Sequence, residues 1–237
     1  WQGLHYDYSM PYWQQFAKAV IISYLITVVV QSPADFRFVV VVITFSLGFD
    51  AVKQGWLQLL LNPGAPNTNR IPFLGDNNVV AVGMAMLLPI VAALAATSHA
   101  WQKRLYQFMS IGVLYRAIST YSRGGLMSIA TLGAMYFWRS PHKARTGAAM
   151  LLAAALIFPV LPQQYWDRMA TITASADERD DSQTGRLYFW QVATTMARDH
   201  PVLGIGHHGY EAAYDEYDRA LGQYGSRRSV HSVWFGV

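Results

Sequence analysis

The feature that most constrains this chain is a succession of long apolar blocks separated by short polar or basic pieces. Only helices and closed barrels satisfy their backbone hydrogen bonds in lipid, and no alternating strand pattern recurs in the sequence. A helix needs about 20 residues to span the bilayer, so the shorter blocks must recruit their polar ends or lie among neighbouring helices. The sequence therefore predicts an all-α, polytopic membrane protein with about six spans. The blocks run over residues 16–31, 38–61, 78–98, 105–120, 125–139 and 147–162.

The composition supports a membrane protein. Charged residues make up 14% of the chain, whereas a soluble protein carries about a quarter. Many of the 14 tyrosines and eight tryptophans stand at the ends of the apolar blocks, as in "HYDYSMPYW" and "YFWRS", which is typical of interfacial aromatic belts. In the alternative, a soluble protein, these would be core or surface aromatics. The chain has no cysteine, which excludes a disulfide framework and a thiolate zinc site.

Two basic loops indicate the orientation of the chain. "HAWQKRL" at 99–105 and "RSPHKAR" at 139–145 carry five lysines and arginines and no acid. By the positive-inside rule both loops face the cytoplasm. The loop at 62–77, the "YSRGG" turn and the long polar segment at 163–230 then all fall on the outer side.

The outer segment is expected to be largely helical. "DERDDSQTG" at 177–185 is acidic and predicts a solvated loop. "RLYFWQVATTMARDH" has helical apolar spacing and is stopped by Pro201. "GYEAAYDEYDRALGQYG" predicts a second helix that ends before Gly225. We expect both helices to lie on the bundle or in the headgroup plane.

Two arginines interrupt the apolar chain at the outer face. Arg123 is followed by Gly124 and Gly125, which permit close approach of a backbone or ligand. An arginine inside a membrane costs about 2.5–3.5 kcal/mol on insertion scales, so it usually faces a polar cavity and finds a partner. The alternative is snorkelling to the headgroups. Arg116 lies seven residues earlier, which on one helix is the same face, and two guanidiniums there suit phosphate oxygens.

A third arginine belongs to the outer segment. "TGRLYFW" puts Arg186 at the start of a predicted helix, where backbone amides and the helix dipole favour an anion. The alternative is a surface salt bridge with the preceding acids. Three arginines on one face of the membrane favour a receptor for a phosphorylated or pyrophosphorylated lipid.

Three polar features near these arginines have structural alternatives. Asp76 of "GDNN" is a plausible N-cap that can also bind a substrate hydroxyl or an arginine. Tyr121 precedes the arginine of "YSRGG", and we expect Arg116, Asp76 and Tyr121 to bind substrate. His231 opens the final apolar run, where it can act as a general base or make only a structural hydrogen bond.

"GIGHHG" at 204–209 has the glycine spacing of a dinucleotide fingerprint, but a charged helix and Pro201 precede it instead of a buried strand. We interpret Gly204 and Gly206 as shaping a tight turn. No HExxH motif or carboxylate cluster accompanies His207 and His208, so we expect no metal site.

The ends of the chain indicate a piece of a longer protein. It starts at Trp1 and stops in "HSVWFGV", which reads as the opening of another span. We therefore expect residues 1–237 to form one transmembrane domain whose outer loop covers 163–230, with further spans outside the sequence.

The order of these motifs resembles a known family. "YSRGG", a long outer loop with "TGRLYFW", then "HPVLGIG" and a histidine opening the next span are similar to the O-antigen ligase and polymerase superfamily. These are bacterial inner-membrane glycosyltransferases acting on undecaprenyl-diphosphate-linked glycans. "GDNNVVAVGMAMLLPI" with "YRAISTYSRGG" resembles the branch of O-glycosylation ligases associated with exosortase systems. The resemblance covers residues 70–237.

The resemblance implies a metal-independent active site without a cofactor, facing the periplasm. By motif its catalytic residues fall on Arg123, Arg186 and His231. The family often has asparagine after the histidine, where this chain has Ser232. The implied partners are the lipid-linked glycan donor, an acceptor that is a glycan, lipid or protein, and the bilayer; no nucleic acid is expected.

Other functions fit parts of the same pattern. A polymerase uses the same donor and site but another lipid-linked repeat as acceptor. A transporter of lipid-linked glycan or another anion uses membrane arginines too, but internal repeats and midplane sites are typical of transporters, and neither is visible here. A membrane scaffold without chemistry would tolerate alanine at Arg123, Arg186 and His231.

Overall fold

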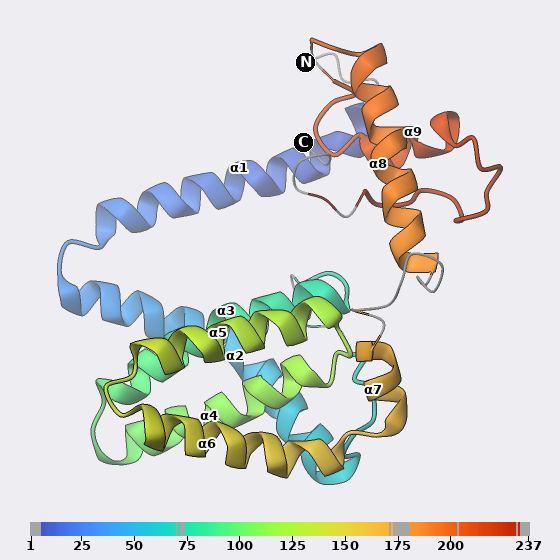
Figure 1. Ribbon diagram of the computed structural model, residues 1–237. Helices are drawn as coiled ribbons and strands as arrows, with labels where there is room; N and C mark the ends of the chain where they lie inside the picture. The colour runs from blue at the N-terminus through green and yellow to red at the C-terminus, as the bar shows by residue number, and fades with distance from the viewer. Residues whose placement is uncertain are drawn as a thin grey trace. The chain divides into compact units, whose positions relative to one another are not determined.

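The computed structural model describes residues 6–69, 71, 74–170, 172, 181–202, 204–230 and 232, without the side chains of 181–184. The described residues are mostly α-helical and contain no β-strand, which confirms the all-α prediction for this part of the chain (Figure 1). The helices are α1 (Tyr6–Val29), α2 (Pro33–Leu61), α3 (Asn77–Ala96), α4 (Ala100–Ile118), α5 (Arg123–Arg139), α6 (Lys143–Ile157) with the short 3₁₀ helix η1 (Phe158–Val160), α7 (Gln163–Ala170), α8 (Asp181–Asp199) and α9 (Tyr210–Tyr217).

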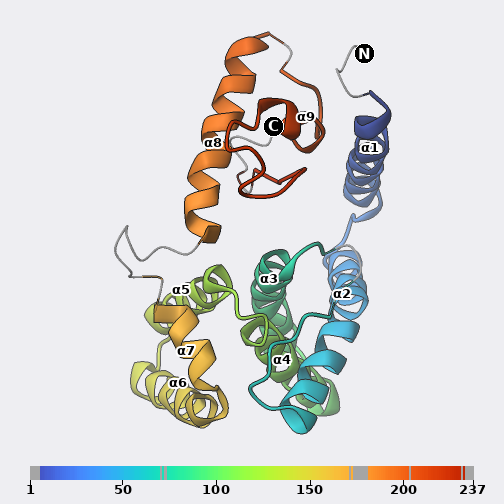
Figure 2. The ribbon, with the colours of Figure 1, turned by 90° about the vertical axis from the view of Figure 1, so that its right-hand side faces the viewer.

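The chain divides into two compact units. One unit contains residues 32–173, in which α2 to α6 run alongside one another and α7 follows them (Figure 2). The other unit contains residues 1–31 and 174–237, with α1, α8 and α9.

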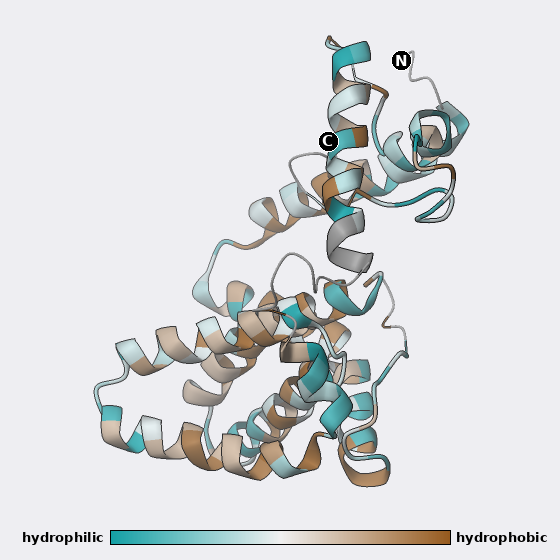
Figure 3. Cartoon of the chain, turned by 45° about the vertical axis from the view of Figure 1, so that its right-hand side comes forward, coloured by the Kyte–Doolittle hydropathy of each residue, from teal (hydrophilic) through white to brown (hydrophobic). Residues whose placement is uncertain are grey.

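The six predicted apolar blocks correspond to α1 through α6. Two segments, Asn77–Ala96 and Lys143–Val160, are long and apolar enough to cross a membrane by length and composition. The second of these segments has no buried residue. Figure 3 shows many hydrophobic residues, coloured brown, along the helices of residues 32–173. Exposed apolar side chains of this kind suit a lipid environment. The number and orientation of spans stay predictions.

Side-chain caps fix where several helices begin. Ser32 and Asp35 form a capping box at the start of α2, which satisfies two backbone donors reciprocally. The Asp76 carboxylate accepts hydrogen bonds from the backbone amides of Asn78 and Val79 at the start of α3, at 2.9 and 3.0 Å. The Ser122 hydroxyl accepts one from the Gly125 amide at the start of α5, at 3.1 Å. The N-cap prediction for Asp76 is therefore confirmed.

The core of residues 32–173 lies between α2, α3 and α4. Helices α2 and α4 cross at Gly55 and Gly112, where a Cβ added to Gly55 would lie 1.9 Å from the Gly112 carbonyl oxygen. Only glycine permits this approach of two backbones. The crossing brings the C-terminal half of α2 against the C-terminal half of α4, where the arginine described below is buried.

The helices that follow α7 differ from their predicted boundaries. α8 begins at Asp181, five residues before Arg186, so residues 181–185 are helical and were wrongly predicted as loop. Acidic and hydroxyl residues are favoured near a helix N-terminus, which explains why this polar stretch joins the helix. α9 ends at Tyr217, although the sequence predicted a helix that ends just before Gly225.

Tyr188 and Asp218 explain the early end of α9. The Asp218 carboxylate accepts hydrogen bonds from the Tyr188 hydroxyl at 2.5 Å and from the amides of Ala220 and Gly222. The Tyr188 hydroxyl in turn accepts from the amides of Arg219 and Ala220. Asp218 therefore captures the following amides in a turn, in competition with the helix. The hydrogen bond from Tyr188 lowers the pKa of the Asp218 carboxyl.

Candidate functional site

The "YSRGG" stretch forms the sharp connection between α4 and α5. α4 ends at Ile118 and α5 begins at Arg123, so Arg116 and Arg123 belong to different helices. The prediction that their seven-residue spacing puts them on one helical face is therefore wrong. Tyr121 interrupts the helix with a φ of +56°, a left-handed conformation that is rare for a bulky residue.

Arg123 is the first residue of α5 and is half-buried. Its helix packs closely on α3, since a Cβ added to Gly125 would lie 2.5 Å from the Ala81 Cβ. The Ser122 hydroxyl donates to the Asn78 side-chain oxygen at 2.8 Å and joins the first turns of the two helices. The guanidinium of Arg123 thus belongs to the end of the bundle where α3 and α5 both begin, and both helix dipoles there favour an anion.

Arg116 is completely buried in the last turn of α4. Its Nε donates to the Gln54 side-chain oxygen of α2 at 2.9 Å. Its Nη1 and Nη2 donate to the carbonyl oxygens of Asn67 and Asn69 at 3.4 and 2.6 Å. All three nitrogens therefore have protein acceptors, and the negative end of the α4 dipole lies nearby. The predicted contact between Arg116 and a phosphate stays a prediction.

Two tyrosines bind the connection between α2 and α3, to which Asn67 and Asn69 also belong. The Gly64 amide donates to the Tyr115 hydroxyl at 2.8 Å, and the Tyr121 hydroxyl donates to the Gly64 carbonyl oxygen. The Tyr121 ring also meets the Tyr165 ring of α7 edge-on at 5.0 Å. Tyr121 is buried, so its hydroxyl serves the protein backbone; its predicted role in binding substrate stays a prediction.

Arg186 lies in the second turn of α8 and is half-buried. The helix starts earlier than predicted, so the expectation of free backbone amides at Arg186 is wrong. Among the described residues, the buried Nε of Arg186 has no hydrogen-bond partner. The alternative of an ion pair with the preceding acids concerns side chains outside the described part of the chain.

The surroundings of Arg186 are aromatic. The neighbouring Gly185 is buried, and a Cβ added to it would lie 3.3 Å from both Phe189 and Tyr224. The Tyr188 and Tyr224 rings are stacked at 5.2 Å, and the Arg228 guanidinium lies 5.8 Å from the Phe189 ring centre. Tight packing of α8 on the 224–228 stretch leaves Arg186 in a partly desolvated position, where charge interactions are stronger than in water.

The "GIGHHG" stretch forms a tight turn, as predicted. Gly204, Gly206 and His208 all have positive φ values, of +59°, +97° and +56°. The His208 ring stacks on Tyr12 of α1 at 3.8 Å, within the same unit. The stretch follows α8 rather than a strand, so the dinucleotide interpretation is not supported. No group of three or more potential metal ligands occurs among the residues that the structure describes.

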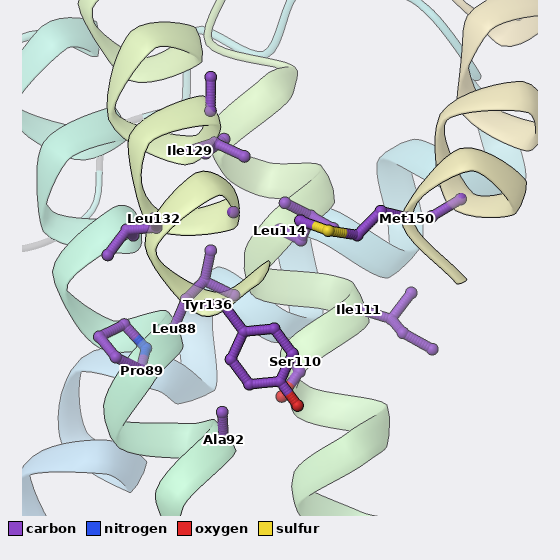
Figure 4. Close-up of a pocket in the computed structure, with 13 residues that line it drawn as sticks. Leu88, Pro89, Ala92, Ser110, Ile111, Leu114, Ile129, Leu132, Tyr136 and Met150 are labelled. Carbon is purple, nitrogen blue, oxygen red and sulfur yellow. The ribbon is translucent and has the colours of Figure 1, made fainter. Parts of the chain in front are cut away.

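An apolar cavity of about 510 Å³ lies between α3, α4, α5 and α6 (Figure 4). Its walls are formed by aliphatic side chains such as Leu88, Ile111 and Met150, and its only hydroxyls among the described residues are Ser110 and Tyr136. The α5 wall starts at Ile129, six residues after Arg123, or about 9 Å along a helix. The cavity therefore has the chemistry to hold a hydrocarbon chain.

The structure brings four of the six predicted site residues into one unit. Asp76, Arg116, Tyr121 and Arg123 all belong to residues 32–173, whereas Arg186 belongs to the other unit. His231 lies outside the described residues. A meeting of Arg123, Arg186 and His231 therefore stays a prediction.

Sequence reasoning missed Gln54 and Asn67 as acceptors of Arg116, and it also missed the contacts of Tyr115 with Gly64 and of Asn78 with Ser122. Gln54 and Asn78 make these contacts through side-chain amides inside apolar blocks, and such polar side chains signal interhelical hydrogen bonds. That signal was available, but it does not say which residue each amide meets.

Comparison with known proteins connects this chain to a protein family. A family model described as O-antigen ligase matches residues 108–237, which is more than half of the chain. The matched part begins inside α4 and includes the "YSRGG" turn, α5, α8 and α9. No curated protein and no solved structure matches the chain.

Proposed function

We propose, because this chain belongs to the O-antigen ligase family, that it transfers a glycan from undecaprenyl diphosphate to an acceptor hydroxyl. The family match makes the protein a membrane glycan ligase in broad terms. The lipid diphosphate donor, the acceptor and reaction at the periplasmic face of the bacterial inner membrane are our proposal. The observation that carries it is a family match that contains both Arg123 and Arg186.

The position of Arg123 supports a role in binding phosphate. A guanidinium offers planar paired donors that fit phosphate oxygens. Arg123 stands at the N-terminus of α5, joined to the start of α3 by the Ser122–Asn78 hydrogen bond. Helix N-termini favour anions. The Asp76 carboxylate already caps α3, so a diphosphate there would gain from the arginine and from the start of α5.

The buried Nε of Arg186 has no hydrogen-bond partner among the residues that the structure describes, and this supports the same role. A buried donor without an acceptor costs about 1–3 kcal/mol, and a phosphate oxygen would supply that acceptor. We propose that Arg186 binds the diphosphate and neutralises charge on it as the bond to the sugar breaks.

In the proposed reaction, the acceptor hydroxyl oxygen attacks the anomeric carbon of the donor sugar. The bond between that carbon and the diphosphate oxygen breaks, and undecaprenyl diphosphate leaves with the electron pair. Arg123 and Arg186 stabilise the charge that collects on the leaving oxygen. His231 takes the hydroxyl proton or orients the donor.

The apolar cavity lined by α3, α4, α5 and α6 is a proposed site for the polyprenyl chain of the donor. Its α5 wall starts about 9 Å along the helix from Arg123, so one lipid would have its diphosphate at the helix end and its chain beside α5. Filling the cavity should therefore weaken donor binding without touching the reacting groups.

The cavity prediction is tested with Ala92, which lines it, and Ala93, which is exposed next to it on α3. Ala92→Phe should raise KM for a long-chain donor about tenfold, which corresponds to about 1.4 kcal/mol of lost binding, and leave kcat nearly unchanged. Ala93→Phe should change neither constant. Equal KM values for the two variants would show that the cavity does not bind the donor.

The proposed function is tested in the cell that makes the full-length protein. Surface glycan and undecaprenyl-diphosphate-linked glycan are measured with and without the gene. Loss of surface glycan with full-length glycan on the lipid carrier supports the ligase. Single repeats on the carrier would indicate a polymerase, and lipid-linked glycan confined to the inner leaflet would indicate transport. Unchanged amounts of surface glycan and lipid-linked glycan would indicate a scaffold without chemistry.

A further inference from the structure

We infer that Arg116 is a positioning residue that fixes the connection between α2 and α3, and with it the end of the bundle that carries Arg123. This connection, residues 62–76, is called the α2–α3 loop. The inference rests on the proposed function for its consequence on transfer, but its structural part stands independently of any reaction.

Each of the three nitrogens of the buried guanidinium donates to a protein group. Arg116 is 0% exposed and donates to one amide side chain of α2 and two backbone carbonyls of the α2–α3 loop. Desolvating a cation is costly unless its donors are paired, and the planar fork of arginine reaches several acceptors that a lysine ammonium cannot reach together. A phosphate could reach this guanidinium only by displacing the loop.

The residues on both sides of Arg116 bind the same loop. Tyr115 and Tyr121 hold the amide and carbonyl of Gly64, and the Asn67 amide donates to the Ser119 carbonyl oxygen at 2.7 Å. Gly64 has a φ of +81°, and a Cβ there would lie 2.3 Å from the Val160 carbonyl oxygen. The loop is therefore held at Gly64, Asn67 and Asn69 by the last turn of α4 and the turn after it.

The loop leads directly into the first turn of α3, which is the partner of α5. Asp76 caps α3, and Asn78 accepts the hydrogen bond from Ser122, the residue before Arg123. A displacement of the loop would therefore be transmitted to the Asn78–Ser122 contact and to the backbone that carries Arg123. Arg116 acts on the donor site through this chain of bonds, without touching the donor.

The experiment combines kinetics with a readout of loop position. Ala65 of the loop is half-buried, and residues 1–237 contain no cysteine. Ala65→Cys in the full chain, with any cysteine outside these residues replaced, reports loop exposure through its rate of modification by a polar maleimide. The variants are Arg116→Lys, which keeps the charge, and Gln54→Ala, which removes the side-chain acceptor of Nε.

Arg37 provides a matched control. Its guanidinium also joins helices, donating to the hydroxyls of Thr97 and Ser98 at 2.9 and 2.8 Å. These residues follow α3, so they lie at the end of that helix away from Asp76. Arg37→Lys should therefore change neither the modification rate of residue 65 nor the donor KM.

We expect Arg116→Lys to raise the modification rate several-fold and to reduce kcat/KM for the donor by about tenfold or more, since small misplacements of binding groups have effects of that order. Gln54→Ala should also raise the modification rate and reduce kcat/KM, but by smaller factors than Arg116→Lys. Lost transfer with unchanged modification would mean that Arg116 contacts the donor directly. If neither the modification rate nor kcat/KM changes, Arg116 neither positions the α2–α3 loop nor affects donor binding.

Failure of the proposed function gives a different pattern. If the wild-type chain shows no transfer while Arg116→Lys still exposes residue 65, the positioning role of Arg116 is supported and the proposed reaction is contradicted. If transfer occurs in the wild type and the loop readout is unmoved by every variant, the positioning inference alone is overturned.

Discussion

An Arg186→Ala protein of normal abundance should transfer glycan at least about 100-fold more slowly than the wild type, the loss typical of removing one donor that stabilises transition-state charge. Full-length glycan should then collect on the lipid carrier. The physical reason is that Arg186 is half-buried and its Nε has no acceptor among the described residues. Arg186→Lys should recover only part of the rate, because an ammonium is a point charge without the planar fork.

The matched control for Arg186 lies on the same helix. Arg198 is exposed in the last turn of α8, away from the packed aromatic residues. Arg198→Ala should leave transfer within about twofold of the wild type, as expected for a surface charge. Equal rates for Arg186→Ala and wild type, measured at equal protein level, would contradict the proposed role of Arg186 in holding the diphosphate.

Arg123→Ala should cause a loss of similar size, about 100-fold or more in kcat/KM for the lipid-linked donor. Arg123 stands where α3 and α5 both begin, so its removal would leave these helix ends without the side chain that we propose pairs with phosphate. Arg139 in the last turn of α5 is the control. Arg139→Ala should change transfer little, because it lies at the opposite end of the same helix.

The kinetics of Arg123→Ala also separate the alternatives for this residue. A snorkelling arginine interacts with lipid headgroups, so its removal would lower protein abundance or stability without changing transfer per molecule. A diphosphate ligand predicts the reverse, normal abundance with slow transfer. Normal transfer per molecule by Arg123→Ala would therefore favour snorkelling and contradict the proposed site.

The positions of the helices were readable from the sequence, because length and apolar content alone predict a helix in lipid. All six apolar blocks correspond to helices. The polar segment at 163–230 was harder to predict, since local side-chain contacts decide where its helices end. α9 stops where Asp218 and Tyr188 capture the next amides, a tertiary contact that the helical spacing of residues 210–225 does not reveal.

The candidate site was predictable in its residue types and less so in its geometry. The predicted close approach at the glycines of "YSRGG" is confirmed for Gly125, which packs on the Ala81 side chain, whereas a Cβ on Gly124 would meet only the Ser122 hydroxyl oxygen at 3.8 Å. The grouping of Arg116 with Arg123 failed because Tyr121 takes a left-handed conformation between them. The acceptors of Arg116 include backbone carbonyls of Asn67 and Asn69, and a sequence does not mark which carbonyl a buried cation will meet.

The most direct test of the proposed reaction uses the purified full-length protein in vesicles with an undecaprenyl-diphosphate-linked glycan and a candidate acceptor. We expect glycosylated acceptor and free undecaprenyl diphosphate to appear in equal amounts, also with a chelator present. Transfer should be reduced to near background in Arg186→Ala. Intact donor after incubation with every acceptor class, or wild-type transfer by Arg186→Ala, would contradict the proposed diphosphate site.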